Sequence, residues 1–381
     1  MKWLLALCLI ACGSSREGVV LWHAYNGPER AALEHVAAEW NDLHPETPLT
    51  LVQVPYDAFA DKITSAVPNG NGPDLFVYSH DRIGDWAAAG VIEPIEFWVD
   101  DSIAGRYQKD ALAAMAYRDD LWGLPMALKC LALFYRTDRI SAPPKTTDEL
   151  FAMAARARGS YPLAYANSDL YDHAPWLHGF GGVVLDEHGE LRIASAEAAD
   201  AMAFSKRLID RGVVPAETTG PLVETLFNEG KADMALEGPW FVGDIAKGVP
   251  WAVSTLPIVS ETGRPAAPFF SAEGVLMSAR ARDKDAAFAV MLFIAGDRSA
   301  NERARDAGQI VPNAGVHDDA TQAVFRKQLE HTVLIPAAPA MRMVWTPYMT
   351  ALAKVQSGGE SPSDALLEVE REVRRYSEPP R

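Results

Sequence analysis

The chain has 381 residues, of which 49% are apolar, and its formal net charge is −16. A chain of this length buries a large core and is long for one compact domain, so we expect two lobes with a space between them. The negative charge disfavours binding to nucleic acid, which needs a basic surface, and electrostatic docking on anionic lipid.

The N-terminus is typical of an exported protein. Lys2 precedes an apolar run over residues 3–11, which is too short to span a bilayer. We therefore interpret residues 1–11 as a signal peptide. The alternative is an incorrectly assigned start, in which this stretch is an ordinary chain terminus.

The end of this apolar run has the letters LIACGSS and resembles a bacterial lipobox, in which Cys12 becomes the acylated first residue of the mature protein. Residues 12–17 are then a tether that contains Gly and Ser. Cys8 would leave with the signal and Cys130 would be the remaining thiol, so we expect no intrachain disulfide. This processing predicts a protein in the periplasm or at the cell surface, attached to a bacterial membrane by a lipid anchor.

The first part of the chain alternates predicted strands and helices. Strands are predicted at residues 19–22, 49–54 and 75–78, with helices that start at Pro28 and near Asp57. Three strands separated by helices predict a parallel, right-handed βαβαβ unit.

The third of these strands leads into a charged tip. Residues 72–73 are Gly and Pro and close a turn, and the apolar residues 75–78 follow them. Residues 79–81 are able to cap a helix that carries Trp86. In open α/β sheets, ligands bind beyond the carboxyl ends of the strands, so this tip is a candidate binding place.

A second α/β unit follows. Thr146 and Glu149 form a capping-box pattern ahead of a helix that reaches about Ala157. From about residue 283 onward the chain is mostly helical, with an amphipathic tail over residues 363–376. Further strands are predicted at residues 131–135, 161–165 and 231–236, and a further helix at residues 195–211, ended by Gly212.

Signatures of catalysis and of cofactor binding are missing. The sequence has no GxGxxG motif, no phosphate loop, no CxxC and no HExxH, so we expect no cofactor. His80 beside Asp81 lacks a second histidine at ligand spacing, which disfavours a metal site. A glycosidase remains an alternative because Asp81, Asp169 and Glu237 could converge, although the sequence identifies no environment that raises the pKa of one of them.

Several aromatic residues lie where loops or helix starts are predicted. Tyr171, Trp240 and Trp345 stand beside Pro, Gly or Asp, and a flat ring in such a place can pack on the apolar face of a sugar. The alternative for each ring is a place in the core of a lobe.

Three segments in the same order resemble the maltose/maltodextrin-binding group of extracellular solute-binding proteins, which serve ABC sugar importers. Residues 72–82 (GPDLFVYSHDR) are similar to the family's GPDI…AHDR segment, and residues 238–240 (GPW) to its NGPW turn. Residues 125–135 resemble its first crossing between lobes. The resemblance implies an α/β periplasmic-binding-protein fold of class II type, with two lobes joined by a multi-segment hinge.

In this fold each lobe is expected to be a mostly parallel sheet flanked by helices. We predict that the first lobe comprises residues 18–126 plus 265–313 and the second lobe residues 127–264 plus 314–381. The hinge then consists of three crossings, near residue 127, residues 256–268 and residues 312–315.

The resemblance also implies a set of ligand-binding residues. From the first lobe, Tyr78, Asp81 and Arg82 would contact sugar hydroxyls, with a helix cap as the alternative for Asp81 and a surface ion pair as that for Arg82. From the second lobe, Tyr171, Trp240 and Trp345 would stack on the sugar, beside the acidic Asp169. Lys129 and Tyr25 are predicted to contact the ligand as well. The sequence departs from the family at both places, because maltodextrin binders have a glutamate at Lys129 and acidic and lysine contacts in the loop around Tyr25.

The function that follows is transport. The protein would bind maltose, a maltodextrin, trehalose or a related glucoside, close its hinge, and deliver the sugar to the permease of an ABC transporter. It would act as a monomer and not as an enzyme. The alternatives are a binding protein for a non-sugar solute, such as an oligopeptide, a polyamine or a metal chelate, and a cell-surface glycosidase.

Overall fold

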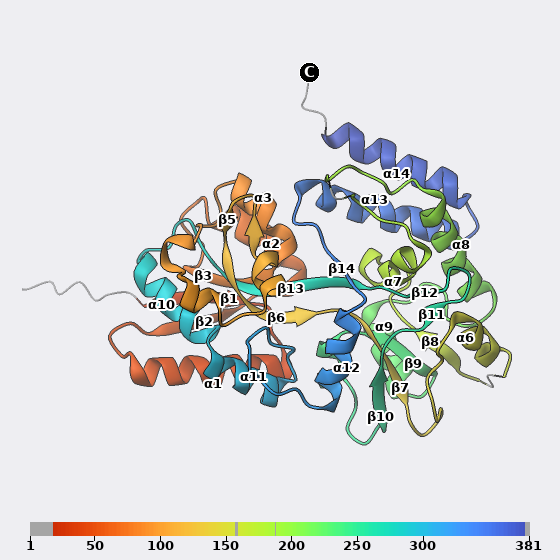
Figure 1. The fold of residues 1–381 in the computed structure, drawn as a ribbon, viewed down its shortest axis with the longest axis horizontal. Coiled ribbons are helices and arrows are strands. Elements are labelled where there is room, and N and C mark those ends of the chain that lie inside the picture. Colours follow the sequence, from red (N-terminus) through yellow and green to blue (C-terminus); the bar gives the residue numbers. More distant parts are fainter. Residues whose placement is uncertain (1–17, 157–158, 187, 378–381) are drawn as a thin grey trace, which may run out of the picture.

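The computed structural model describes residues 18–156, 159–186 and 188–377. These residues form two α/β lobes, each built around its own sheet (Figure 1). The predicted signal peptide over residues 1–11, the acylated Cys12 and the tether over residues 12–17 lie outside the described residues. Within the described ranges, no helix is long and apolar enough to cross a membrane.

The first sheet has the order β14-β13-β3-β1-β2, and β6 also pairs with β13. Its strands are β1 (Val19–His23), β2 (Leu49–Gln53), β3 (Leu75–Ser79), β6 (Gly123–Lys129), β13 (Phe269–Met277) and β14 (Val333–Leu334). Parallel pairing of β1 with both β2 and β3 confirms the predicted βαβαβ unit. Its crossover helices are α1 (Gly27–Leu43) and α2 (Tyr56–Ala66).

Helices cover both faces of this sheet (Figure 1). The inner stripe of α1, with Leu33, Val36 and Trp40, is buried against strands β1, β3 and β13. The other helical elements of this lobe are η1 (His80–Arg82), α3 (Ile83–Ala88), η2 (Glu96–Trp98), α4 (Asp101–Ala104), α5 (Lys109–Ala114), α10 (Lys284–Ile294) and α11 (Asp297–Ala307). A small hairpin of β4 (Ala116–Tyr117) and β5 (Asp120–Leu121) lies beside them.

The second sheet has the order β10-β7-β9-β8. Its strands are β7 (Ala132–Arg136), β8 (Tyr161–Ala164), β9 (Ala232–Glu237) and β10 (Trp251–Ser254). Only β8 and β9 pair in parallel, whereas β7 is antiparallel to both β9 and β10. The predicted mostly parallel sheet is therefore wrong for this lobe. Only Cys130 and Leu131 separate β6 from β7, so β7 enters the second sheet directly from the first.

The second lobe holds most of the later helices. They are α6 (Thr147–Ala154), α7 (Leu170–Phe180), α8 (Ala196–Asp210), α9 (Gly220–Asn228), η3 (Pro239–Gly243), α12 (Ala320–Leu329), α13 (Pro339–Gln356) and α14 (Pro362–Ser377). A two-stranded ribbon of β11 (Ile258–Val259) and β12 (Arg264–Pro265) packs near α7. The capping box before α6 is half formed, because Thr146 accepts from the amide of Glu149 while the Glu149 carboxylate accepts from Lys145.

The lobes are connected at several places. The chain passes from β6 to β7 at Cys130 and Leu131, from β10 to β13, and from α11 to α12. After α12 it returns to the first sheet, where β14 pairs with the start of β13, and then enters α13. Cys130 is a buried free thiol, and burial raises its pKa. The predicted lobe boundaries stay a prediction.

Candidate functional site

The charged tip after β3 forms the short helix η1, which continues into α3. No side chain caps η1 or α3, so the predicted cap by residues 79–81 is wrong, and with it the capping alternative for Asp81.

Arg82 lies mostly inside the protein, with its side chain 12% exposed. Its guanidinium lies over the Trp86 ring, 5.3 Å from the centroid, and its Nε is 3.5 Å from a carboxylate oxygen of Asp85. Nε and Nη2 are buried and make no hydrogen bond of ordinary geometry with the described residues. Arg82 therefore does form an ion pair, as the alternative predicted, but a mostly buried one, and its role as a ligand contact stays a prediction.

Tyr78 belongs to a stack of three rings. Its ring centroid lies 5.6 Å from that of Tyr56 and 5.3 Å from that of Phe59. Tyr56 is 59% exposed, yet desolvation raises its pKa, and the negative charge of Asp81 acts in the same direction. The hydroxyl of Tyr171 in the second lobe also raises this pKa. The Tyr56 side chain is thus exposed to solvent but surrounded by protein. We expect this combination on a concave surface that faces the other lobe.

Lys129 at the end of β6 forms an ion pair with Glu273 of β13, which we call the central ion pair. Its Nζ lies 3.2 Å from Glu273 Oε1, and the Tyr25 hydroxyl donates to Oε2 at 2.6 Å. Nζ also lies 5.8 Å from the ring centroids of both Tyr25 and Trp240. Burial alone would lower the pKa of Lys129, but the carboxylates of Glu273 and Glu29 raise it, so the ammonium stays charged.

The three predicted stacking residues of the second lobe are joined with Phe269 in one series of ring contacts. The centroid of Tyr171 lies 6.3 Å from those of Trp240 and Phe269, and Phe269 lies 6.2 Å from Trp345. The Tyr171 hydroxyl is buried and has no hydrogen-bond partner of ordinary geometry among the described residues. Sequence reasoning missed Phe269, whose apolar strand gave no sign of a site.

Three carboxyl groups of the second lobe are neighbours of these rings. Asp169 caps α7, accepting from the amide of Tyr171 at 2.7 Å, and burial raises its pKa. Glu237 accepts from the indole Nε1 of Trp240 at 3.0 Å, and burial raises its pKa to about 7. Burial and the charges of Glu237 and Asp169 raise the pKa of Asp172 well above its usual range. The structure thus contains carboxyl groups with a raised pKa, which the glycosidase alternative requires and which the sequence did not identify.

We name two surfaces by these residues. The first-lobe face consists of Tyr56, Tyr78, Asp81 and Arg82. The second-lobe face consists of Asp169, Tyr171, Glu237, Trp240 and Trp345. The sequence had named seven of these nine residues as ligand contacts; it had considered Glu237 only for catalysis and had not considered Tyr56.

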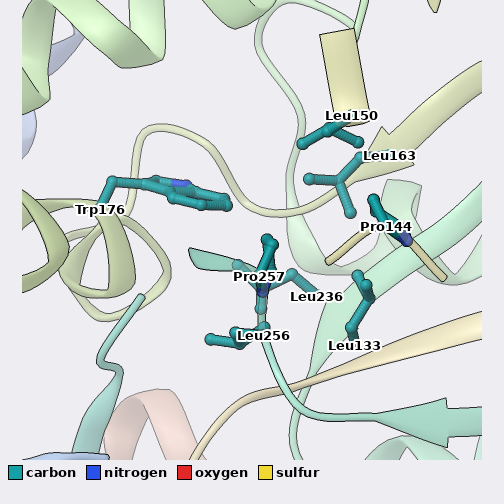
Figure 2. A pocket seen from close by; sticks show the side chains of 8 residues that line it. All are labelled: Leu133, Pro144, Leu150, Leu163, Trp176, Leu236, Leu256 and Pro257. Atoms are coloured by element: carbon teal, nitrogen blue, oxygen red, sulfur yellow. The ribbon is translucent and has the colours of Figure 1, made fainter. Parts of the chain in front are cut away.

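The described part of the chain has no group of three or more His, Cys, Asp or Glu residues able to hold a metal ion. A small cavity of about 10 Å³ lies in the second lobe and is surrounded by apolar side chains (Figure 2). A wider surface groove of about 460 Å³ lies between α8 and the turn from α13 to α14. Neither of these two contains a residue of the two faces.

Comparison with known proteins gives a consistent result. The sequence profile of the family described as "Bacterial extracellular solute-binding protein" matches residues 36–328. The chain is 26% identical to the maltotriose-binding protein of Pyrococcus abyssi, over 96% of this chain and 82% of that protein. It is 24% identical to the galactooligosaccharide-binding protein of Bacillus subtilis, over 95% and 92%.

Solved structures are similar over nearly the whole chain. The Thermus thermophilus maltotriose-binding protein with bound maltotriose matches with a TM-score of 0.87 and 25% identity, covering 94% of this chain and 99% of that one. A cyclo/maltodextrin-binding protein in complex with maltotetraose matches with a TM-score of 0.82 and 26% identity, covering 94% and 97%. The predicted two-lobe fold is confirmed by these matches.

Proposed function

The chain belongs to the bacterial extracellular solute-binding proteins, and we propose that it binds a maltodextrin or a related glucoside between the first-lobe face and the second-lobe face. The observation that carries this proposal is a pair of poorly satisfied buried donors, one on each face. Arg82 makes no hydrogen bond through Nε or Nη2 among the described residues and has only the Asp85 carboxylate at 3.5 Å from Nε. The Tyr171 hydroxyl has only a weak interaction with Ser271. Buried polar groups without partners are rare in proteins, and a ligand with hydroxyl groups would satisfy both.

The chemistry of the two faces suits a neutral sugar. Asp81 accepts hydroxyl protons while Arg82 donates to oxygens, and each charge-assisted bond contributes roughly 1.5–3 kcal/mol net. Trp240 and Trp345 offer flat, partly exposed rings to the apolar faces of the sugar units. The relatives named above that bind maltotriose and galactooligosaccharide support an oligosaccharide as the ligand.

The central ion pair lies between the two faces and shapes the choice of sugar. Lys129 is held by Glu273 and by the rings of Tyr25 and Trp240. Its ammonium donates to sugar oxygens, where a glutamate in the maltodextrin binders would accept from sugar hydroxyls. Maltose, longer maltodextrins, trehalose and other glucosides therefore remain candidates that a binding screen separates.

In this function the sugar bridges the lobes and favours the closed form, because it contacts both faces only there. The closed protein would present the sugar to the permease of an ABC transporter. A relative from Streptococcus pneumoniae is named as a maltooligosaccharide ABC transporter solute-binding lipoprotein, which supports both this partner and a lipid anchor at Cys12. We further propose a monomer outside the cytoplasm, without cofactor or catalytic activity, and with the lobe boundaries predicted above.

A thermal-shift screen of the mature protein over mono-, di- and oligosaccharides tests the proposal. A ligand present at about 100 times its dissociation constant stabilises the native state by roughly 2.7 kcal/mol, so a binder gives a clear shift. A shift with maltotriose or trehalose and none with amino acids is expected. No shift with any saccharide, together with a shift for a peptide, polyamine or metal chelate, would favour the non-sugar alternative.

A glycosidase remains the second candidate because of one observation, the raised pKa of Glu237, which a general acid also needs. Glu237 is mostly buried, however, and one of its carboxyl oxygens already accepts from Trp240. Incubation of the pure protein with maltooligosaccharides separates the two functions. Stoichiometric binding without products is expected, and steady release of shorter sugars would overturn the transport function.

A further inference from the structure

His80 precedes the proposed sugar contacts Asp81 and Arg82, and it is 1% exposed. Its Nδ1 accepts from the amide of Ala272 at 3.2 Å, and its Nε2 lies 2.9 Å from the carbonyl oxygen of Ile335. Because Nδ1 is an acceptor, the ring carries its proton on Nε2 and donates it to Ile335. Both nitrogens are occupied, so the ring is not available to a metal or to a substrate.

The two partners of His80 belong to segments that connect the lobes. Ala272 lies on β13, whose neighbours in the first sheet are β3 and β6. Ile335 begins the segment of residues 335–338, which we call the connecting segment, and it leads from β14 into α13. Helix α13 packs on α8 and α14 of the second lobe and carries Trp345. The His80 side chain therefore links the tip after β3 to the connecting segment, and through that segment to α13 and Trp345.

Two further contacts join α3, which follows the tip, to the connecting segment and to α13. Gly84 of α3 lies so close to the connecting segment that a Cβ atom there would clash with the carbonyl oxygen of Ala337. At the start of α13, Arg342 Nη1 lies 3.5 Å from the same Asp85 oxygen that is 3.5 Å from Arg82 Nε. Arg342 is 53% exposed, so this pair contributes little energy, whereas the bonds of His80 are buried.

We propose that His80 is a positioning residue that couples sugar contact at Asp81 and Arg82 to α13 and Trp345 through its bond to Ile335. The proposal rests on the proposed function, since it concerns how that site transmits occupancy to the hinge. When a bound sugar displaces Asp81 and Arg82, the connecting segment moves with them because His80 is bonded to Ile335. The ring stays neutral in this role, because burial lowers its pKa although the charge of the neighbouring Asp81 raises it.

Two conservative variants separate the two bonds of His80. Gln places an amide donor near the position of Nε2 and keeps the bond to Ile335, whereas Asn places an acceptor near the position of Nδ1 and keeps the bond to Ala272. We expect His80→Gln to bind maltotriose within about threefold of the wild type and His80→Asn to bind about tenfold more weakly, as one lost buried bond implies. Affinity is measured by calorimetry.

Gln328 gives a matched control. It is also buried and also joins two backbone groups, accepting from the amide of Leu256 at the predicted crossing over residues 256–268 and donating to the carbonyl oxygen of His331. It belongs to neither face, so it tests whether loosening the hinge region elsewhere has the same effect. Gln328→Asn is expected to lower stability and to leave the affinity unchanged. If it weakens binding as much as His80→Asn, the effect is general loosening and the proposal is overturned.

Amide hydrogen exchange of the sugar-free protein tests the link without any ligand. His80→Asn should accelerate exchange at Ile335, whose amide donates to Phe270, while His80→Gln should accelerate exchange only near Ala272. Unchanged exchange at Ile335 in a folded His80→Asn protein overturns the proposal. If the wild type binds no saccharide, the proposed function fails and the exchange result still decides whether His80 makes this link.

Discussion

The two faces of the candidate site differ in how they hold charge. The first-lobe face has side chains of both signs, with a carboxylate at Asp81 and a guanidinium at Arg82 whose Nε and Nη2 make no hydrogen bond with the described residues. The second-lobe face has carboxyl groups with a raised pKa and a continuous set of rings around Phe269. The first face is thus equipped to orient hydroxyl groups, and the second to offer an apolar, weakly charged surface.

The largest expected effect is on the pH dependence of stability, and it comes from a buried histidine of α7, the helix that Asp169 caps. His173 on α7 is buried, and neither of its nitrogens has a hydrogen-bond partner within the described ranges. Burial lowers its pKa to about 3, with His178 acting in the same direction. Below pH 6.5 the unfolded chain binds a proton that the native state does not. This residue should therefore remove about 3 kcal/mol of stability between pH 7 and pH 4.

Urea unfolding of the wild type and of His173→Leu at both pH values measures this effect. The loss of stability on acidification should be about 3 kcal/mol smaller in the variant, because titrating groups remote from His173 contribute equally to both proteins. An equal loss in both proteins would show that His173 is not a neutral buried group.

Removal of charge from the first-lobe face should have the next largest effect. Arg82→Ala and Asp81→Ala each remove a charge-assisted partner of the sugar, so the affinity for maltotriose should fall about 10- to 100-fold. Arg342→Gln is the control, since Arg342 approaches the same Asp85 from an exposed position. Calorimetry with wild-type affinity in Arg82→Ala would exclude Arg82 from the site.

Removal of a ring from the second-lobe face should weaken binding by about tenfold, through lost stacking area. Trp240→Ala tests this, and calorimetry with maltotriose measures it. Trp98→Ala is the control, because Trp98 is also partly exposed and stacks on Phe288 in the first lobe. Equal affinities of the two tryptophan variants would remove Trp240 from the site.

The smallest expected effect concerns Glu237. Its pKa of about 7 lies above the usual value, so the native state holds a proton that the unfolded state releases, and stability falls as pH rises through 7. The wild type should lose about 1 kcal/mol between pH 6 and pH 8. Glu237→Gln keeps an acceptor for Trp240 and should show no such loss. A parallel decline in both proteins would place the titration elsewhere.

The sequence predicted the elements that local patterns encode. Residues 75–78 form a strand, and the helix predicted over residues 195–211 is α8 (Ala196–Asp210). Strand direction in the second lobe was not predictable in this way, because the apolar runs at β7 and β9 do not depend on the orientation of their neighbours. The turn at residues 79–81 was read as a cap, since Ser and Asp are common there, although the backbone continues from η1 into α3.

The candidate site was predictable where residues follow a strand or a loop signal, as at Asp81 and Trp240. Glu273 was not, because it is a single carboxylate in an apolar strand and its partners are 144 and 248 residues away in the sequence. Only the fold brings these residues together. The same holds for His80, whose two partners lie more than 190 residues further along the chain.

The buried thiol of Cys130 makes the protein suitable for site-selective labelling. Thiol reagents react with the thiolate, and burial between the lobes both blocks access to this sulfur and raises its pKa. A version of the chain that starts at residue 18 contains no other cysteine. A single cysteine introduced on either lobe could therefore carry a fluorophore without background, and the chain would become an optical sensor for its own ligand.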